Sequence, residues 1–190
     1  MKVRESGMPE EQLWETFFDP PRILTRLDFT DPKADVVEFG CGYGTFTVDA
    51  AGRTAGTVYA FDIEPQMIET TARKAHAAGL ANVRAVLRDF VAAGTGLAEA
   101  SVGYAMLFNI LHAERPLILL QEAFRVLVPG GRVAVIHWIY DASTPRGPDL
   151  SIRPRPEQSQ DWVRQAGFHL AIPLVPLPPH HYGMVGRKPF

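Results

Sequence analysis

The sequence predicts an α/β protein with a doubly wound, seven-stranded, mostly parallel sheet that ends in an antiparallel hairpin. From residue 35 onward, strand-like and helix-like segments alternate, which is the pattern of a parallel sheet covered by helices. A buried strand at 35–40 leads directly into a glycine-rich turn. Near the C-terminus, the strand-like segments 168–175 and 180–188 are joined by Pro-Leu-Pro-Pro, a connector short enough to indicate a hairpin.

The elements between these landmarks follow from apolar runs and from the residues that break them. Prolines at the start and glycines past the end mark helices, as at Pro65 and Gly79. The run at 132–140 is too continuously apolar for a strand with one wet face, so it should be buried on both faces. We expect helices at 45–51, 65–78, 116–128 and 157–166, and further strands at 57–62, 82–89, 102–109 and 132–140.

The whole chain, 1–190, is expected to form one domain, with 35–140 as its ligand-binding core. Residues 1–30 stand apart from that core. Leu13, Trp14, Phe17 and Phe18 fall at helical spacing, and Asp19-Pro20-Pro21 should end their helix. This segment is either a helix simply packed on the sheet or a lid over the ligand; we expect the lid.

Composition narrows the class of protein. The net charge of −2 and the pI near 6.3 give no basic field, so a nucleic-acid partner is not expected. Cys41 is the sole cysteine, and the scattered histidines form no persuasive metal set, so no metal is expected. The first dozen residues are polar, and no apolar run is long enough to span a membrane. The expected compartment is the cytoplasm, with no membrane partner.

The glycine turn of residues 40–44 opens a helix, an arrangement typical of nucleotide-type ligands. Its spacing is Gly40, Gly42, Gly44, and Thr45 occupies the position where the dinucleotide pattern requires its third glycine. Asp62 ends the second strand, 22 residues after Gly40, where a carboxylate can accept both hydroxyls of an adenosine ribose. The third strand ends in Arg88-Asp89-Phe90, suited to an adenine amino group and ring face, although either acid could instead cap a helix.

These segments, taken in order, resemble the class I S-adenosylmethionine (SAM)-dependent methyltransferases, specifically the small-molecule-type branch. The resemblance covers 35–140 and is carried by V-V-E-F-G-C-G-Y-G-T-F (36–46), A-F-D-I-E-P-Q-M-I (60–68), R-D-F (88–90), L-F-N-I-L-H (107–112) and E-A-F-R-V-L-V-P-G-G-R-V (122–133). It implies a Rossmann-like fold and SAM as cofactor. It also implies that the cofactor is held by Glu38, Gly40, Gly42, Asp62, Ile63, Asp89, Phe90 and Asn109.

The sequence indicates the residues that contact the methyl acceptor less specifically than those that bind the cofactor. His112 follows the fourth strand, where ligands meet in open α/β sheets, so it is the candidate catalytic base. His137 and Trp138 at the end of the fifth strand are candidate acceptor contacts. In the proline-rich loop 141–156, Arg146 or Arg153 could bind an anionic acceptor, although loop arginines more often only face solvent.

The leading interpretation is an enzyme that transfers the methyl group of SAM to a small molecule. Methylation of RNA or protein is an alternative, but Asn109 is followed by Ile110-Leu111-His112 and not by the Pro-Pro-aromatic motif of nucleobase amino-methylation. A SAM-binding protein without catalysis is a third possibility, because fold and cofactor site do not prove turnover. An NAD-dependent dehydrogenase fits least well, because of the glycine spacing. The acceptor and the oligomeric state are not specified.

Overall fold

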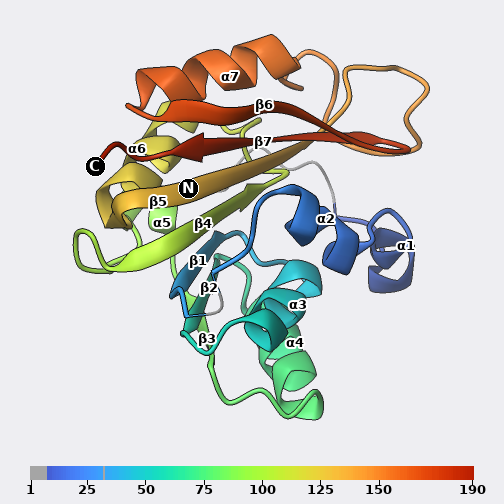
Figure 1. The fold of residues 1–190 in the computed structure, drawn as a ribbon. Coiled ribbons are helices and arrows are strands. Elements are labelled where there is room, and N and C mark those ends of the chain that lie inside the picture. Colours follow the sequence, from blue (N-terminus) through green and yellow to red (C-terminus); the bar gives the residue numbers. More distant parts are fainter. Residues whose placement is uncertain (1–7, 32) are drawn as a thin grey trace.

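The computed structural model describes residues 8–31 and 33–190, and in this part of the chain seven strands form one sheet in the order β3-β2-β1-β4-β5-β7-β6 (Figure 1). The doubly wound α/β fold expected from the sequence is confirmed. The strands are β1 Val36–Phe39, β2 Val58–Asp62, β3 Val83–Leu87, β4 Val102–Phe108, β5 Leu127–Trp138, β6 His169–Leu177 and β7 His181–Arg187. The helices are α1 Glu11–Glu15, α2 Pro20–Arg26, α3 Thr45–Arg53, α4 Pro65–Ala77, α5 Phe90–Ala93, α6 Pro116–Val126 and α7 Pro156–Gln165.

The strand directions agree with the expected pattern. β1 to β5 pair in parallel, whereas β7 runs antiparallel to both β5 and β6, which confirms the C-terminal hairpin. The buried run on β5 contributes Val133 and Val135 to one apolar cluster and Ala134 and Ile136 to the other, so neither of its faces is wet. Because parallel strands end at the same edge, the carboxyl ends of β1, β2 and β4 come together there.

Strand β5 begins earlier than its sequence predicts. Leu127 is already extended and pairs with Val102, whereas the next pair joins Arg132 to Tyr104. The residues between Leu127 and Arg132, including Pro129-Gly130-Gly131, are therefore an irregularity within the strand rather than a loop before it. The expectation of a strand starting at residue 132 missed this, because proline and glycine normally mark a break.

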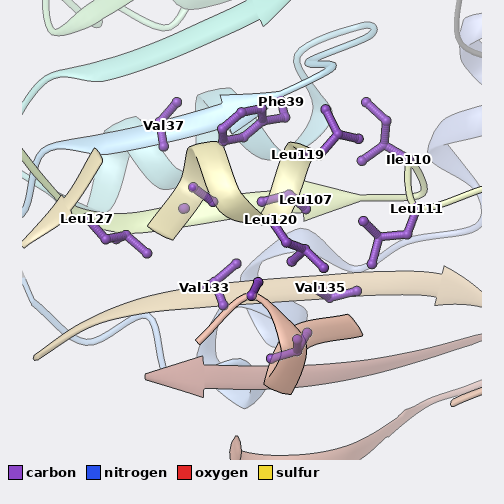
Figure 2. Close-up of a cluster of buried hydrophobic side chains, with 14 of the residues drawn as sticks. Val37, Phe39, Leu107, Ile110, Leu111, Leu119, Leu120, Leu127, Val133 and Val135 are labelled. Carbon is purple, nitrogen blue, oxygen red and sulfur yellow. The ribbon is translucent and has the colours of Figure 1, made fainter. Parts of the chain in front are cut away.

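Helices cover both faces of the sheet and enclose two apolar clusters. On one face, α5, α6 and α7 pack against residues such as Phe39, Leu107 and Val135 (Figure 2). On the other face, α2 and α3 pack against Val36, Met106 and their neighbours, with α4 beside α3 (Figure 1). The two helical layers leave the carboxyl edge of β1, β2 and β4 uncovered by either cluster.

The N-terminal segment contains two helices where the sequence predicted one. Asp19 does not end a helix; its carboxylate accepts the N–H of Arg22 at 3.2 Å and so caps α2, which Pro20 begins. Ile23 and Leu24 of α2 are buried in the core, whereas α1 buries no residue. The part of residues 1–30 that could act as a lid is therefore α1. Residues 1–7 lie outside the described part of the chain.

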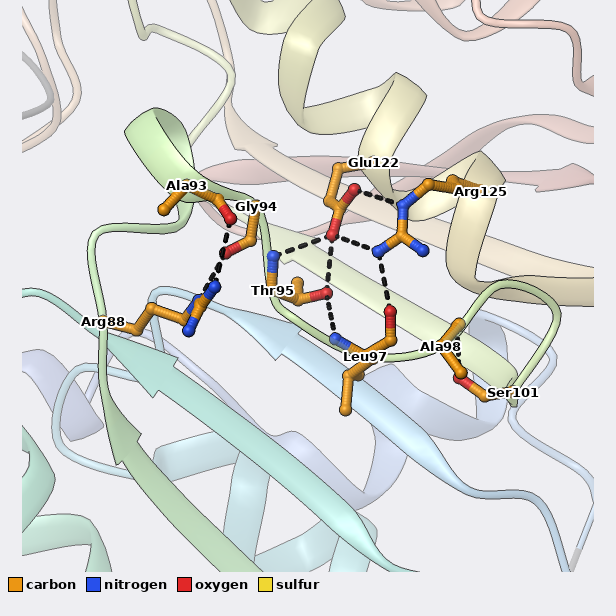
Figure 3. Close-up of polar contacts among 9 residues, drawn as sticks. All are labelled: Arg88, Ala93, Gly94, Thr95, Leu97, Ala98, Ser101, Glu122 and Arg125. Atoms are coloured by element: carbon orange, nitrogen blue, oxygen red, sulfur yellow. Dashed lines mark hydrogen bonds and ion pairs between the residues drawn. The ribbon is translucent and has the colours of Figure 1, made fainter.

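A polar network fixes the segment that follows β3. Glu122 on α6 accepts the N–H and the hydroxyl of Thr95 and forms an ion pair with Arg125 at 2.8 Å (Figure 3). Arg88 donates to the backbone carbonyls of Ala93 and Gly94. Together these bonds tie the chain after α5 to α6, and α5 carries Phe90 at the edge of the sheet.

Candidate functional site

A cavity of about 380 Å³ opens at the carboxyl ends of β1, β2 and β4, the position where ligands bind in open α/β sheets. A smaller hollow of about 200 Å³ lies near the opposite ends of the strands, around Gly103 and Gly131. The large cavity is lined mostly by apolar side chains with a few polar groups. Its lining residues are Met8, Trp14, Glu38, Gly40, Cys41, Gly42, Thr45, Phe46, Asp62, Ile63, Glu64, Gln66, Met67, Phe90, Phe108, Asn109, Ile110, His112 and Trp138.

The glycine turn and Asp62 form one hydrogen-bonded unit in the cavity wall. Gly40 and Gly42 have φ of +77° and +52°, a region that glycine adopts without strain. The N–H of Gly42 donates to one carboxylate oxygen of Asp62 at 2.9 Å, and the N–H of Glu64 donates to the other at 3.0 Å. Asp62 is thereby held in place, and each oxygen keeps a lone pair for a further donor.

Four backbone N–H groups of the turn, those of Gly40, Cys41, Gly42 and Gly44, are bonded within the protein. Those of Gly40 and Cys41 both donate to the carbonyl of Phe61 at 2.9 Å, and that of Gly44 donates to Cys41. A pyrophosphate-binding turn uses unbonded N–H groups, so these internal bonds favour a ligand without phosphates at the turn.

Glu38, at the end of β1, is a buried carboxylic acid in the same wall. Its side chain is 2% exposed, and it accepts a hydrogen bond from the hydroxyl of Thr47. Burial and, more weakly, the charge of Asp62 raise the pKa of Glu38 to about 8, against the lowering effect of the Thr47 bond. A cationic group bound beside Glu38 would restore its ionised form.

Asn109 lines the cavity directly after β4. It follows β4 with φ of +55°, an unusual backbone conformation for a residue other than glycine. Both polar atoms of its buried side-chain amide lack a hydrogen-bond partner among the described residues. Buried amides are normally satisfied, so an unsatisfied one at a cavity wall indicates a ligand contact.

Ile63 and Phe90 line the cavity as the sequence predicted, whereas Asp89 does not line it. Asp89 instead caps α5, accepting the N–H of Ala92 at 2.9 Å. Its side chain therefore already has the helix-capping role that the sequence left open as an alternative.

The structure brings together two of the predicted acceptor residues. His112 and Trp138 both line the cavity, and both are at least nine-tenths buried. His137 is fully buried behind His112, with 3.4 Å between Nε2 of His137 and Nδ1 of His112. Trp138 packs against His181, with ring centroids 4.2 Å apart. His137 therefore reaches the cavity through His112 alone.

The arginines of loop 141–156 are not part of the cavity wall. Arg153 is 7% exposed, and its guanidinium donates to the carbonyls of Pro148, Ile139, Asp141 and Arg146 as well as to the hydroxyl of Thr144. It organises its own loop and has no donor left for an anion. Arg146 is likewise outside the lining residues.

Helix α1 and the residues before it contribute part of the cavity wall. Met8 and Trp14 line the cavity, and Tyr43 donates its hydroxyl to the carbonyl of Pro9 at 2.9 Å. Lys74 on α4 forms ion pairs with Glu11 at 3.0 Å and with Glu15 of α1. The sequence had indicated Trp14 by its helical spacing, whereas no sequence signal marked Met8 or the Lys74 pairs.

The profile of a family described as "Methyltransferase domain" matches residues 36–131. This range contains Glu38, the glycine turn, Asp62 and Asn109, but not Met8 and Trp14. The chain belongs to the SAM-dependent methyltransferase family. The TM-score to a crystal structure of a SAM-dependent methyltransferase from Aquifex aeolicus is 0.81 at 22% identity, covering 94% of this chain and 93% of that one. For geranyl diphosphate methyltransferase in complex with SAM the TM-score is 0.73 at 14% identity, with 98% and 95% covered. At these identities the likeness concerns the fold.

Curated relatives of this methyltransferase include ribosomal protein L11 methyltransferases. The one from Legionella pneumophila (strain Paris) is 32% identical over 123 residues, which are 64% of this chain and 40% of that protein. The one from Methylococcus capsulatus is 37% identical over 114 residues, covering 59% and 36%. The chain thus spans about 40% of the length of these relatives. No helix among the described residues is long and apolar enough to cross a membrane.

SAM, the cofactor of the family, fits the residues present. The charged side chains that line the cavity, Glu38, Asp62 and Glu64, are all acidic, which suits a ligand with ammonium and sulfonium charges. Asp62 keeps lone pairs for ribose hydroxyls, Ile63 and Phe90 offer apolar faces to an adenine, and Asn109 offers an unsatisfied amide. The internally bonded glycine turn suits a cofactor without phosphates.

Proposed function

We propose that this chain transfers the methyl group of SAM to a small molecule that carries no negative charge and has an apolar or aromatic body. The observation that carries the proposal is the division of the cavity wall. Asp62, Gly42 and Glu38 lie at the ends of β2 and β1, whereas Asn109, His112 and Trp138 lie at the ends of the neighbouring strands β4 and β5. Methyl transfer requires donor and acceptor to be aligned in line, and a cavity with two chemically distinct ends can do this.

The acceptor's charge is inferred from the cavity wall. Among the described lining residues there is no lysine or arginine, and Arg153 is already fully engaged in its own loop. An anionic acceptor would therefore face acidic groups without a counter-charge. Trp138, Phe46 and Phe108 instead offer aromatic surface, which favours an apolar acceptor.

In this proposal, each residue has a defined task. Asp62 binds the ribose, Glu38 the ammonium group of SAM, and Asn109 contacts both ligands. His112 accepts the proton that the acceptor loses, if the reactive atom carries one. Trp138 and α1 exclude water from the reacting atoms. SAM supplies the methyl group.

Methylation of a protein is the second candidate, because the curated relatives include ribosomal protein L11 methyltransferases. The cover formed by Met8 and Trp14 argues against it, since a polypeptide acceptor needs a groove open along its length. The shared segment also spans less than half of those relatives. A small molecule remains the better fit to a concave, mostly apolar cavity.

The test is incubation of the protein with methyl-labelled SAM and a cell extract separated into small molecules, proteins and RNA. The proposal expects label in an uncharged or cationic small molecule, and much less label with the Asp62→Ala variant at a limiting SAM concentration. Label confined to protein or RNA would overturn the small-molecule acceptor. Absence of transfer to any fraction, despite SAM binding, would favour a non-catalytic SAM-binding protein.

A further inference from the structure

Trp138, the last residue of β5, is a tightly packed part of the cavity wall. It lines the cavity although it is only 2% exposed. Its indole packs against the rings of His181 and Phe17, with ring centroids 4.2 Å and 5.3 Å apart. A further contact comes from loop 141–156, none of whose residues lines the cavity. The position of the indole therefore depends on a loop that a ligand does not touch.

Gly147 is the residue of this loop that lies against the indole. A Cβ atom at this position would lie 2.8 Å from Cγ of Trp138 and 2.9 Å from Nη2 of Arg153, closer than side chains pack. The φ of Gly147 is +113°, a backbone conformation that glycine adopts without strain and other residues rarely adopt. Glycine is thus required here both by the backbone and by the space between the indole and the guanidinium.

Arg153 holds the loop and the end of β5 together. Its guanidinium donates to the carbonyls of Arg146 at 3.3 Å and Pro148 at 2.8 Å, the two residues that flank Gly147. The same guanidinium donates to the carbonyl of Ile139 at 3.0 Å, and Ile139 directly follows Trp138. Because the guanidinium is a rigid planar fork, these bonds fix the separation of the two backbone segments. Arg153 therefore presses Gly147 onto the indole.

We propose that Gly147 is a specificity-determining residue and Arg153 a positioning residue, which together fix Trp138 and so set the space available to the methyl acceptor. This inference rests on the proposed function. A side chain at position 147 requires either the indole or the loop to move, and Arg153 fastens the loop to the end of β5. The indole therefore moves toward the cavity, the open space beside it. The acceptor loses volume, whereas Glu38 and Asp62, on β1 and β2, keep their places.

The position of the indole can be read without any acceptor. The chain has three tryptophans, so ¹⁹F spectra of protein labelled with 5-fluorotryptophan contain three resonances, which Trp14→Phe and Trp162→Phe assign. Gly147→Ala should shift the Trp138 resonance. Gly52→Ala is the matched control, because a Cβ at this exposed position on α3 meets no atom within 4 Å. An unchanged Trp138 resonance in Gly147→Ala would show that the loop gives way instead, and overturns the proposal.

The effect on the acceptor is read from methyl transfer. Transfer from methyl-labelled SAM to serial dilutions of the small-molecule fraction gives an apparent KM and a maximal rate, and calorimetry gives the SAM affinity. Gly147→Ala should raise the apparent KM by about tenfold or more, the effect of one surplus methyl group in an apolar pocket, and should leave the SAM affinity unchanged. An unchanged KM, or an equal loss of SAM affinity, overturns the specificity role.

Arg153→Lys tests the positioning role, and it decides alone if Gly147→Ala does not fold. Lysine keeps the charge but is a point donor that cannot span both backbone segments, so the Trp138 resonance should shift and the apparent KM should rise. Arg164→Lys on α7 is the control and should change neither. A wild-type spectrum and KM in Arg153→Lys contradict the role of Arg153. Absence of transfer by the wild type would contradict the proposed function, and the fluorine spectra would still decide whether the loop holds Trp138.

Discussion

Asp62 accepts the backbone N–H of Gly42 at 2.9 Å, so the acid at the end of β2 and the glycine turn at the end of β1 form one rigid wall. The two residues are 20 positions apart in the sequence, and the parallel pairing of β1 with β2 brings them together. This contact explains why the spacing of glycines and acid is a specific signal. It fixes the orientation of the carboxylate that we propose binds the ribose.

Replacing Asp62 by Ala should weaken SAM binding by about 1.5–3 kcal/mol, the value of hydrogen bonds to a charged acceptor. Isothermal titration calorimetry measures the change. Asp161→Ala, which removes an exposed acid on α7, is the control and should bind SAM like wild type. If Asp62→Ala keeps its affinity, the carboxylate serves only to hold Gly42 and Glu64.

SAM binding should strengthen as the pH rises toward 8. Below that pH, Glu38 is protonated in the free protein, because burial raises its pKa to about 8. The ammonium group of SAM favours the carboxylate, so binding releases a proton and affinity increases by up to about tenfold per pH unit. Calorimetry in two buffers with different ionisation enthalpies counts the released protons.

The control for this pH dependence is Glu38→Gln. The α-amino group of SAM also titrates near pH 8, and that contribution is the same in both proteins. The difference between wild type and Glu38→Gln therefore isolates Glu38. Identical pH profiles would show that Glu38 does not meet the ammonium group.

Lys74→Ala should speed the release of SAM without unfolding the protein. Lys74 holds α1 through Glu11 and Glu15, and partly exposed ion pairs contribute about 0.2–1 kcal/mol each. Release should therefore accelerate by up to about 30-fold, and high salt should accelerate the wild type toward the same rate. Stopped-flow fluorescence of Trp14 follows the reaction. Arg164→Ala, which breaks an ion pair on α7, should change nothing; equal rates in wild type and Lys74→Ala would contradict a lid role for α1.

Glu122→Gln should destabilise the fold by about 1–3 kcal/mol at neutral pH. Although burial opposes it, hydrogen bonds from Arg125 and Thr95 lower the pKa of Glu122 to about 2. A lowered pKa stabilises the fold above the unfolded-state value of about 4.3, and the benefit disappears as the pH falls toward 2. Urea unfolding from pH 7 to pH 3 should show the gap closing. Glu69→Gln, an exposed change on α4, is the control; a gap independent of pH would exclude this ionic cause.

The sequence predicted the sheet well because its strands are continuous apolar runs, as at Ile136 and its neighbours on β5. The sequence predicted the wrong ends of strands and helices where a residue that usually breaks an element lies inside one or between two. Pro129 normally marks a break, yet pairing of Leu127 with Val102 extends the strand past it. Asp19 reads equally as the end of one helix or the cap of the next, and only packing of Leu24 in the core decides.

Residue type and spacing predicted that Asp62 and the glycine turn share one site, and the structure places both in the cavity wall. Contacts between distant segments could not be predicted, because they depend on where the side chains point in the folded chain. Arg153 had the composition of an anion binder, but its burial and its bonds to loop carbonyls depend on the folded path of the loop. The contact of His137 with His112 likewise depends on the turn that follows Asn109.

The central claim, that this cavity binds SAM, is tested most directly by calorimetric titration of the purified protein with SAM, S-adenosylhomocysteine and NAD. The account predicts saturable binding of SAM and S-adenosylhomocysteine at a single site and no heat with NAD, because the N–H groups of Gly40, Cys41 and Gly42 are already bonded within the protein. Saturable binding of NAD together with no binding of SAM or S-adenosylhomocysteine would contradict it.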